Sequence, residues 1–80
     1  MKFETGQIVI STAGRDKGAW LAVTDITEHG VLVFDGKERP LERPKRKNPR
    51  HLSPTAYRLD APAMATNRRL KRALREVKIQ

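Results

Sequence analysis

Apolar residues follow two different spacings in the two halves of this chain, and this change of spacing constrains the fold most. In the first half they form three short runs, over residues 7–12, 19–26 and 31–34, separated by glycine-containing polar segments. Short apolar runs separated by turns at intervals of about 8–12 residues predict the strands of a small β-sandwich or barrel. Near the end the spacing becomes i, i+3, i+4, i+7, which predicts a helix with one apolar face. The helical positions are Leu70, Ala73, Leu74 and Val77.

The third apolar run and the turn after it lead to two specific predictions. Residues 31–34 are apolar without alternation, which indicates a central strand covered on both faces. Asp35-Gly36 follows directly, and this dipeptide favours a type I′ hairpin turn because glycine adopts positive φ without strain. We therefore expect a tight hairpin at this point.

A basic segment with three prolines follows, over residues 37–51. Proline fixes φ and lacks an amide donor, so neither a helix nor a central strand is expected here. We predict an extended ribbon held to the sheet at Leu41, with its long side chains facing water. Residues 51–53 are expected to form a closing strand that Pro54 stops.

The rest of the chain is expected to form a linker and one helix. We place the boundaries at residues 1–58 for the β-domain, 59–65 for the linker and 66–78 for the basic helix packed on that domain. Thr66 or Asn67 is suited to cap the helix, because either side chain can accept a hydrogen bond from a free amide of the first turn.

Positive charge is concentrated in two segments. Residues 37–51 hold seven basic side chains against two acidic ones, and residues 66–78 hold six against one. The remaining residues hold four bases and six acids, although the whole chain has a net charge of +8. Such clustering raises self-repulsion, so it indicates that the clusters bind a polyanion, with nucleic acid favoured over an anionic membrane surface.

Several functional classes find no support in the sequence. The chain has 80 residues and no cysteine, so we expect a single domain without disulfides or thiolate metal sites. No apolar segment resembles a secretory signal or approaches the ~20 residues of a membrane span, which predicts a cytoplasmic protein. Two isolated histidines and scattered acids form no catalytic constellation. We expect no enzyme activity, no metal, no cofactor and no small-molecule substrate.

Residues 6–18, Gly-Gln-Ile-Val-Ile-Ser-Thr-Ala-Gly-Arg-Asp-Lys-Gly, resemble the KOW motif of ribosomal proteins and transcription-elongation factors. Residues 35–52, from Asp-Gly-Lys to His-Leu, extend the likeness to small bacterial KOW-domain RNA-binding proteins, which are similar to large-subunit ribosomal proteins of eukaryotic and archaeal type. The resemblance implies an SH3-like five-stranded barrel whose loops near the motif contact RNA. Leu21 stands where many KOW sequences have glycine, so close approach of RNA is not expected there.

These observations predict a non-catalytic, mainly β RNA-binding module that is monomeric and binds ribosomal RNA or the ribosome through phosphate contacts. The candidate RNA-binding residues lie in the glycine-flanked loop, in the basic ribbon and on the helix. They are Arg15, Lys17, Lys37, Arg39, Arg43, Lys45, Arg46, Lys47, Arg50, His51, Arg68, Arg69 and Arg72. Replacing residues 45–47 together by alanine is expected to weaken RNA binding and leave stability nearly unchanged.

Other interpretations remain open at this point. The module could instead recruit a transcription or translation factor through its strand edges. The basic residues of the loop and the ribbon could be ordinary solvated charge, and the apolar helix face is more suited to core packing than to a partner. Trp20 and Tyr57 could stack on unpaired bases, although a small β-domain needs its aromatic residues for the core.

Overall fold

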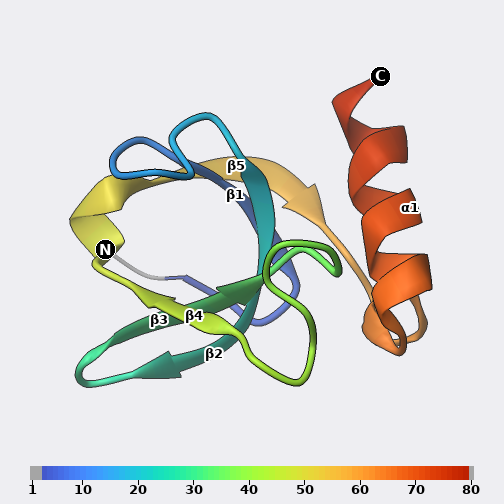
Figure 1. Ribbon diagram of the computed structural model, residues 1–80, viewed down its shortest axis with the longest axis horizontal. Coiled ribbons are helices and arrows are strands. Elements are labelled where there is room, and N and C mark those ends of the chain that lie inside the picture. Colours follow the sequence, from blue (N-terminus) through green and yellow to red (C-terminus); the bar gives the residue numbers. More distant parts are fainter. Residues whose placement is uncertain (1–2, 80) are drawn as a thin grey trace.

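A computed structural model describes residues 3–79 and consists of one antiparallel sheet with a helix against one face (Figure 1). The sheet has five strands in the order β4-β3-β2-β1-β5. Its strands are β1 (Gln7–Ser11), β2 (Trp20–Thr27), β3 (Gly30–Phe34), β4 (Lys45–Lys47) and β5 (Leu52–Arg58). Two short 3₁₀ helices, η1 (Pro49–His51) and η2 (Pro62–Met64), precede β5 and the helix α1 (Asn67–Lys78). The predicted mainly β fold with one C-terminal helix is confirmed.

Alternating residues of the inner strands supply two hydrophobic cores, one on each face of the sheet. In β2, Leu21 and Val23 belong to one core, whereas Trp20 and Ala22 belong to the other. Side chains of a strand alternate between the faces of a sheet, so an apolar run of this kind is stable only where both faces are covered. The first core also contains Phe3, Val9, Val31, Val33 and Leu52. The second contains Ile8, Phe34, Leu70 and Leu74, with Leu41, Leu59, Met64 and Val77 packed around them.

The predicted closed barrel is wrong, because the sheet stays open between β4 and β5. These two strands are its edges, and η1 joins them without a ladder of hydrogen bonds. The sequence explains the short edge. Pro44 and Pro49 flank β4 and lack amide donors, so this strand is limited to three residues. The expectation of a central third strand is met in part, because β3 is an interior strand but β2 lies at the centre.

The predicted tight hairpin at Asp35-Gly36 is also wrong. Gly36 has a φ of +81°, but no residue other than glycine has positive φ in the described chain, and a type I′ turn needs two such residues. Asp35 instead organises a wider loop, since its Oδ1 accepts hydrogen bonds from the amides of Lys37 at 2.9 Å and Arg39 at 2.8 Å. This loop leads to β4, and Leu41 packs against the second core as expected.

The prediction that Pro54 ends the last strand is wrong, because β5 continues to Arg58. Pro54 lies opposite Val9 of β1, and the register shifts between Gln7 and Val9. An edge strand tolerates proline because one side of its backbone needs no partner. The last strand is therefore longer than the sequence indicates.

Helix α1 runs from Asn67 to Lys78 and docks on the sheet. Thr66 is the N-cap, and its Oγ1 accepts a hydrogen bond from the amide of Arg69 at 3.1 Å. Leu70 and Leu74 are buried in the second core. Gly36 lets the loop approach closely, because any side chain there would meet the backbone of Asn67. The helix and the loop before β4 are thus fixed against each other.

Candidate nucleic-acid interface

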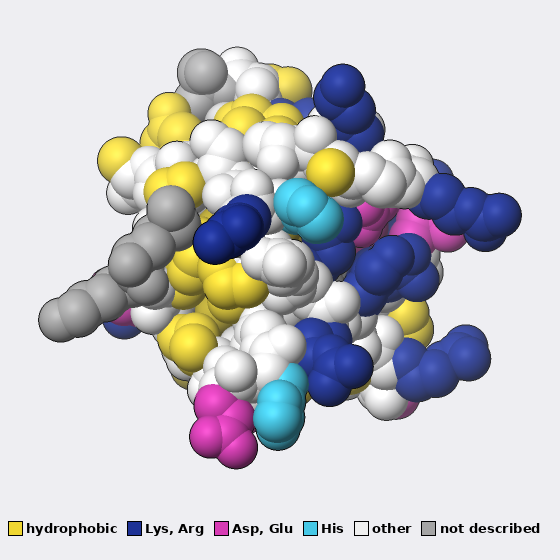
Figure 2. Space-filling model, turned by 90° about the vertical axis from the view of Figure 1, so that its left-hand side faces the viewer, with side chains coloured by type: hydrophobic (Ala, Val, Ile, Leu, Met, Phe, Trp, Pro, Cys, Tyr) yellow, Lys and Arg dark blue, Asp and Glu magenta, His cyan; other side chains and the backbone are white. Residues whose placement is uncertain are grey.

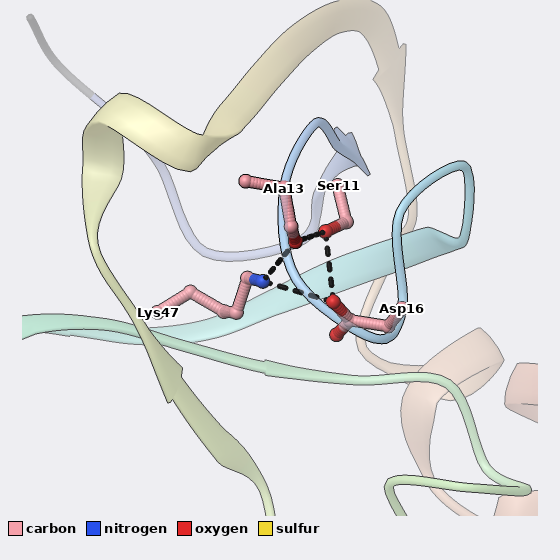
Figure 3. A network of polar contacts seen from close by, with 4 residues as sticks. All are labelled: Ser11, Ala13, Asp16 and Lys47. Atoms are coloured by element: carbon pink, nitrogen blue, oxygen red, sulfur yellow. Dashed lines mark hydrogen bonds and ion pairs between the residues drawn. The ribbon is translucent and has the colours of Figure 1, made fainter.

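A buried ion pair fastens the glycine-flanked loop to β4 (Figure 3). Lys47 Nζ lies 2.9 Å from Asp16 Oδ1 and donates a second hydrogen bond to the carbonyl oxygen of Ala13 at 3.1 Å. The Ser11 hydroxyl lies 2.9 Å from the same Asp16 oxygen. The two ionic side chains are only 7% and 14% exposed. This network holds the loop in one arrangement.

Two opposing effects act on the pKa of Asp16. Burial is the largest and acts to raise this pKa, since it disfavours the charged carboxylate. Hydrogen bonds from Lys47 and Ser11, together with the positive charges of Lys47 and Lys45, outweigh burial and lower the pKa below its ordinary value. The carboxylate is therefore charged at neutral pH, and the ion pair is intact there.

Arg15 and Lys17 lie on either side of Asp16 in the loop, and both are exposed. Gly14 and Gly18 have φ values of +85° and +90°, so the loop turns at both glycines. The amide of Thr12 donates to the carbonyl oxygen of His51 at 2.9 Å, which brings this loop beside η1. The loop cations and the basic residues near η1 therefore belong to one side of the molecule.

We define the strand surface as Arg15, Lys17, Arg46, Arg50 and His51, all of which are exposed. Arg46 is the middle residue of β4, and its stem covers Gly30 of the neighbouring strand. Figure 2 views the side of the molecule on which η1 and the β2–β3 turn lie, and most of the Lys and Arg side chains visible there gather over one half of it. The basic side chains of the strand surface come from three separate segments, which are the glycine-flanked loop, β4 and η1.

The expectation that every ribbon side chain faces water is wrong at three of the predicted RNA-binding residues. Lys47 is buried and paired with Asp16, so its charge is already used inside the fold. Arg39 is half-buried, and it lines a recess of about 470 Å³ that also contains Asp16, Asp35 and Glu38. Three acids thus line the same recess as Arg39, and no salt bridge joins any of them to Arg39 within residues 3–79. Lys45 is half-buried as well, whereas Lys37 and Arg43 are exposed.

We define the helix surface as Lys37 together with Arg68, Lys71, Arg72, Arg75 and Lys78 of α1, all of which are exposed. Four of the helical side chains line a groove of about 650 Å³ beside Gly36 and Asn67. The Arg72–Glu76 pair is loose, with 3.9 Å between Nε and Oε2. Arg69, another predicted RNA-binding residue, is exposed but does not line this groove.

Sequence reasoning missed two features of these surfaces. Lys71 and Lys78 were not among the candidates, although the helical spacing that places Arg68, Arg72 and Arg75 outside the core also places them there. The Asp16–Lys47 pair has no local signal, because 31 residues separate its partners along the chain. Only knowledge of which strands neighbour each other could have found it.

The aromatic residues and histidines divide between core and surface. Phe34 is buried, Tyr57 is 42% exposed, and Trp20 is partly buried against the second core. His29 is exposed in the β2–β3 turn, where Nε2 lies 3.6 Å from Glu28 Oε1.

Within residues 3–79 no group of three or more potential ligands could hold a metal ion. No helix in this part of the chain is long and apolar enough to cross a membrane.

Comparison with known proteins finds similarity to a ribosomal protein. No family model matches the sequence. The chain is nevertheless 28% identical over 71 residues to the large ribosomal subunit protein eL14 of Methanococcus maripaludis strain C6, a match covering 89% of this chain and 87% of that protein. The eL14 protein of strain S2 shows the same identity and coverage. This chain is a distant homologue of archaeal eL14.

Proposed function

We propose that this protein is a non-catalytic RNA-binding module of KOW type that associates with the large ribosomal subunit in the cytoplasm. The observation that carries the proposal is the nearly end-to-end similarity to eL14. Two exposed cationic surfaces support it. Contacts to phosphates do not depend on the base sequence, and they supply a large share of the affinity of proteins for nucleic acid.

The strand surface is the proposed main contact with RNA. Its cations come from elements that the Asp16–Lys47 pair and the Thr12–His51 hydrogen bond fix relative to one another. Because these elements are already fixed, little backbone entropy is lost when their cations meet the backbone of a folded RNA. Binding is led by phosphates and shape, since a folded RNA helix exposes its backbone more than its base edges.

Recruitment of a protein factor through the strand edges has less support. The β4 edge is only three residues long, and the β5 edge carries Pro54 beside a register shift. Short edges, prolines and bulges are the features that hinder strand addition by another chain.

Sedimentation with ribosomal subunits over a series of salt concentrations tests the proposal. If about six cations each neutralise a phosphate, log K falls against log salt with a slope near −4 to −5. A slope weaker than about −1, or binding that persists in high salt, contradicts phosphate contact and favours a protein interface. A purified protein that binds no RNA in dilute buffer overturns the proposal.

A further inference from the structure

The end of α1, the start of β2 and the loop after β3 border a cavity of about 520 Å³ that is open to solvent. Trp20, Leu74 and Ile79 supply apolar walls. Lys37, Lys71, Arg75 and Lys78 line the same cavity. An aromatic side chain and a group of cations thus meet at one place, which was not evident from their positions in the sequence.

We propose that this cavity binds an unpaired nucleotide of the RNA, with the base against Trp20 and the phosphates against the lysines and arginine. The inference rests on the proposed RNA-binding function. Bases that are not paired stack on aromatic side chains, and this stacking strengthens binding by about tenfold or more per base. A base held within a duplex cannot enter such a cavity, so the partner is a single strand, a loop or a bulge.

Charge complementarity selects a nucleotide over an uncharged or a cationic ligand. Among the described residues that line the cavity, four are cations and one, Asp35, carries a carboxylate. Lys71 and Arg75 also line the groove of the helix surface, which is bordered mainly by cations. This groove offers the RNA backbone a continuous path to the cavity, because the two hollows share these side chains.

Asp35 gives the cavity a basis for choosing between bases. Its Oδ1 accepts hydrogen bonds from the amides of Lys37 and Arg39, so the carboxylate is held in place, and no hydrogen bond from the described residues occupies Oδ2. Cytosine, adenine and guanine carry an exocyclic amino group that can donate to this oxygen, whereas uracil presents a carbonyl oxygen at the corresponding position. We therefore expect the cavity to prefer amino-bearing bases over uracil.

Oligocytidylate and oligouridylate of equal length are the matched probes, since they differ only at position 4 (amino or carbonyl) and at N3 (acceptor or donor) and carry the same charge. Trp20 is the only tryptophan, so its emission reports directly on the cavity. We expect oligocytidylate to quench this emission and to bind at least about fivefold more tightly than oligouridylate. A blunt RNA duplex is expected to bind without quenching.

Asp35→Asn sharpens the test because the amide can still accept both backbone hydrogen bonds through Oδ1. Its Nδ2 then faces the ligand as a donor, so the preference is expected to reverse towards oligouridylate. Trp20→Leu is expected to weaken binding of oligocytidylate about tenfold and to leave duplex binding unchanged, as measured by anisotropy of labelled RNA. The Asp35→Asn result stands even if Trp20→Leu fails to fold.

Arg46→Ala is the matched control on the strand surface. It is expected to weaken both probes equally and to leave their ratio unchanged. Equal binding of the two oligonucleotides by the native protein, or unchanged Trp20 emission at saturating RNA, would overturn the nucleotide site and leave the phosphate contacts intact. Failure of every RNA to bind would overturn both proposals.

Discussion

The two basic segments look alike in sequence but differ in how the fold uses their charge. In the ribbon of residues 37–51, Lys47 is buried in an ion pair and Arg39 is half-buried among acids. In helix α1 every basic residue is exposed, and only leucines are fully buried. The ribbon therefore combines structural and available cations, whereas the helix separates the apolar side that docks from the charged side that faces solvent.

Side-chain geometry explains this difference. A helix with apolar residues every three or four positions keeps its remaining residues on the opposite side, so its cations face water. A strand sends successive side chains to opposite faces, which turns Arg46 outward while Lys45 and Lys47 turn towards the inside of the sheet. Two segments of similar positive charge density thus differ in available cations, because β4 of the ribbon turns Lys45 and Lys47 inward whereas α1 exposes all its basic residues.

The largest change in the free energy of unfolding is expected for a substitution where the basic helix meets the core. Leu70→Ala should lower the free energy of unfolding by about 3–4 kcal/mol, because Leu70 is fully buried and its loss leaves a cavity. Arg72→Ala, on the exposed side of the same helix, should change it by less than about 0.5 kcal/mol. Urea unfolding measures both. Similar losses for the two variants would show that the charged side of α1 is also structural.

Lys47→Met is expected to cause the next largest change in the free energy of unfolding. It leaves Asp16 buried without its partner, which should lower the free energy of unfolding by about 3 kcal/mol. Lys45→Met is the neighbouring control and should cost far less, since Lys45 is only half-buried and forms no ion pair with the described residues. Thermal unfolding distinguishes them. If the two variants unfold at the same temperature, the ion pair does not stabilise the loop.

The sequence allowed much of the fold to be predicted, because local patterns determined it. The first three strands and α1 with its Thr66 cap follow from apolar spacing and capping chemistry, which depend on neighbouring residues. The closed barrel, the hairpin at Asp35-Gly36 and the end of the last strand at Pro54 were wrong. These three features depend on which strands lie at the edges of the sheet and on how many loop residues precede the next strand. Both are properties of the assembled sheet and not of neighbouring residues.

The candidate site was predictable only as a distribution of charge. Residue type alone could not distinguish Lys47, which the fold buries, from Arg46, which it exposes. The expectation that replacing residues 45–47 together leaves stability unchanged therefore no longer follows, since this change removes Lys47. The site residues themselves stay predictions until RNA binding is measured.

Lowering the pH should weaken the contact between Asp16 and Lys47 of the ribbon, and it should have little effect on the packing of the helix. The pKa of Asp16 is lowered in the folded state, so the folded chain binds this proton less readily than the unfolded chain does. The resulting stabilisation is complete above the ordinary pKa of 3.8 and is lost as the pH falls through the folded-state value. Asp16→Asn should therefore flatten the loss of stability below about pH 4, as unfolding midpoints across this range would show. An unchanged acid profile in this variant would contradict the assigned pKa shift.

The smallest change in stability is expected at Arg46, whose exposed charge is proposed to serve RNA alone. Arg46→Ala should alter the free energy of unfolding by less than about 0.5 kcal/mol, because the side chain forms no ion pair within residues 3–79. If Arg46 contacts one phosphate, its removal should make the salt slope for RNA binding weaker by about 0.7–0.9. Salt titrations of Arg46→Ala and Arg72→Ala on one ribosomal RNA fragment compare the two surfaces directly. A changed slope for Arg72→Ala and none for Arg46→Ala would make the helix, and not the strand surface, the main contact.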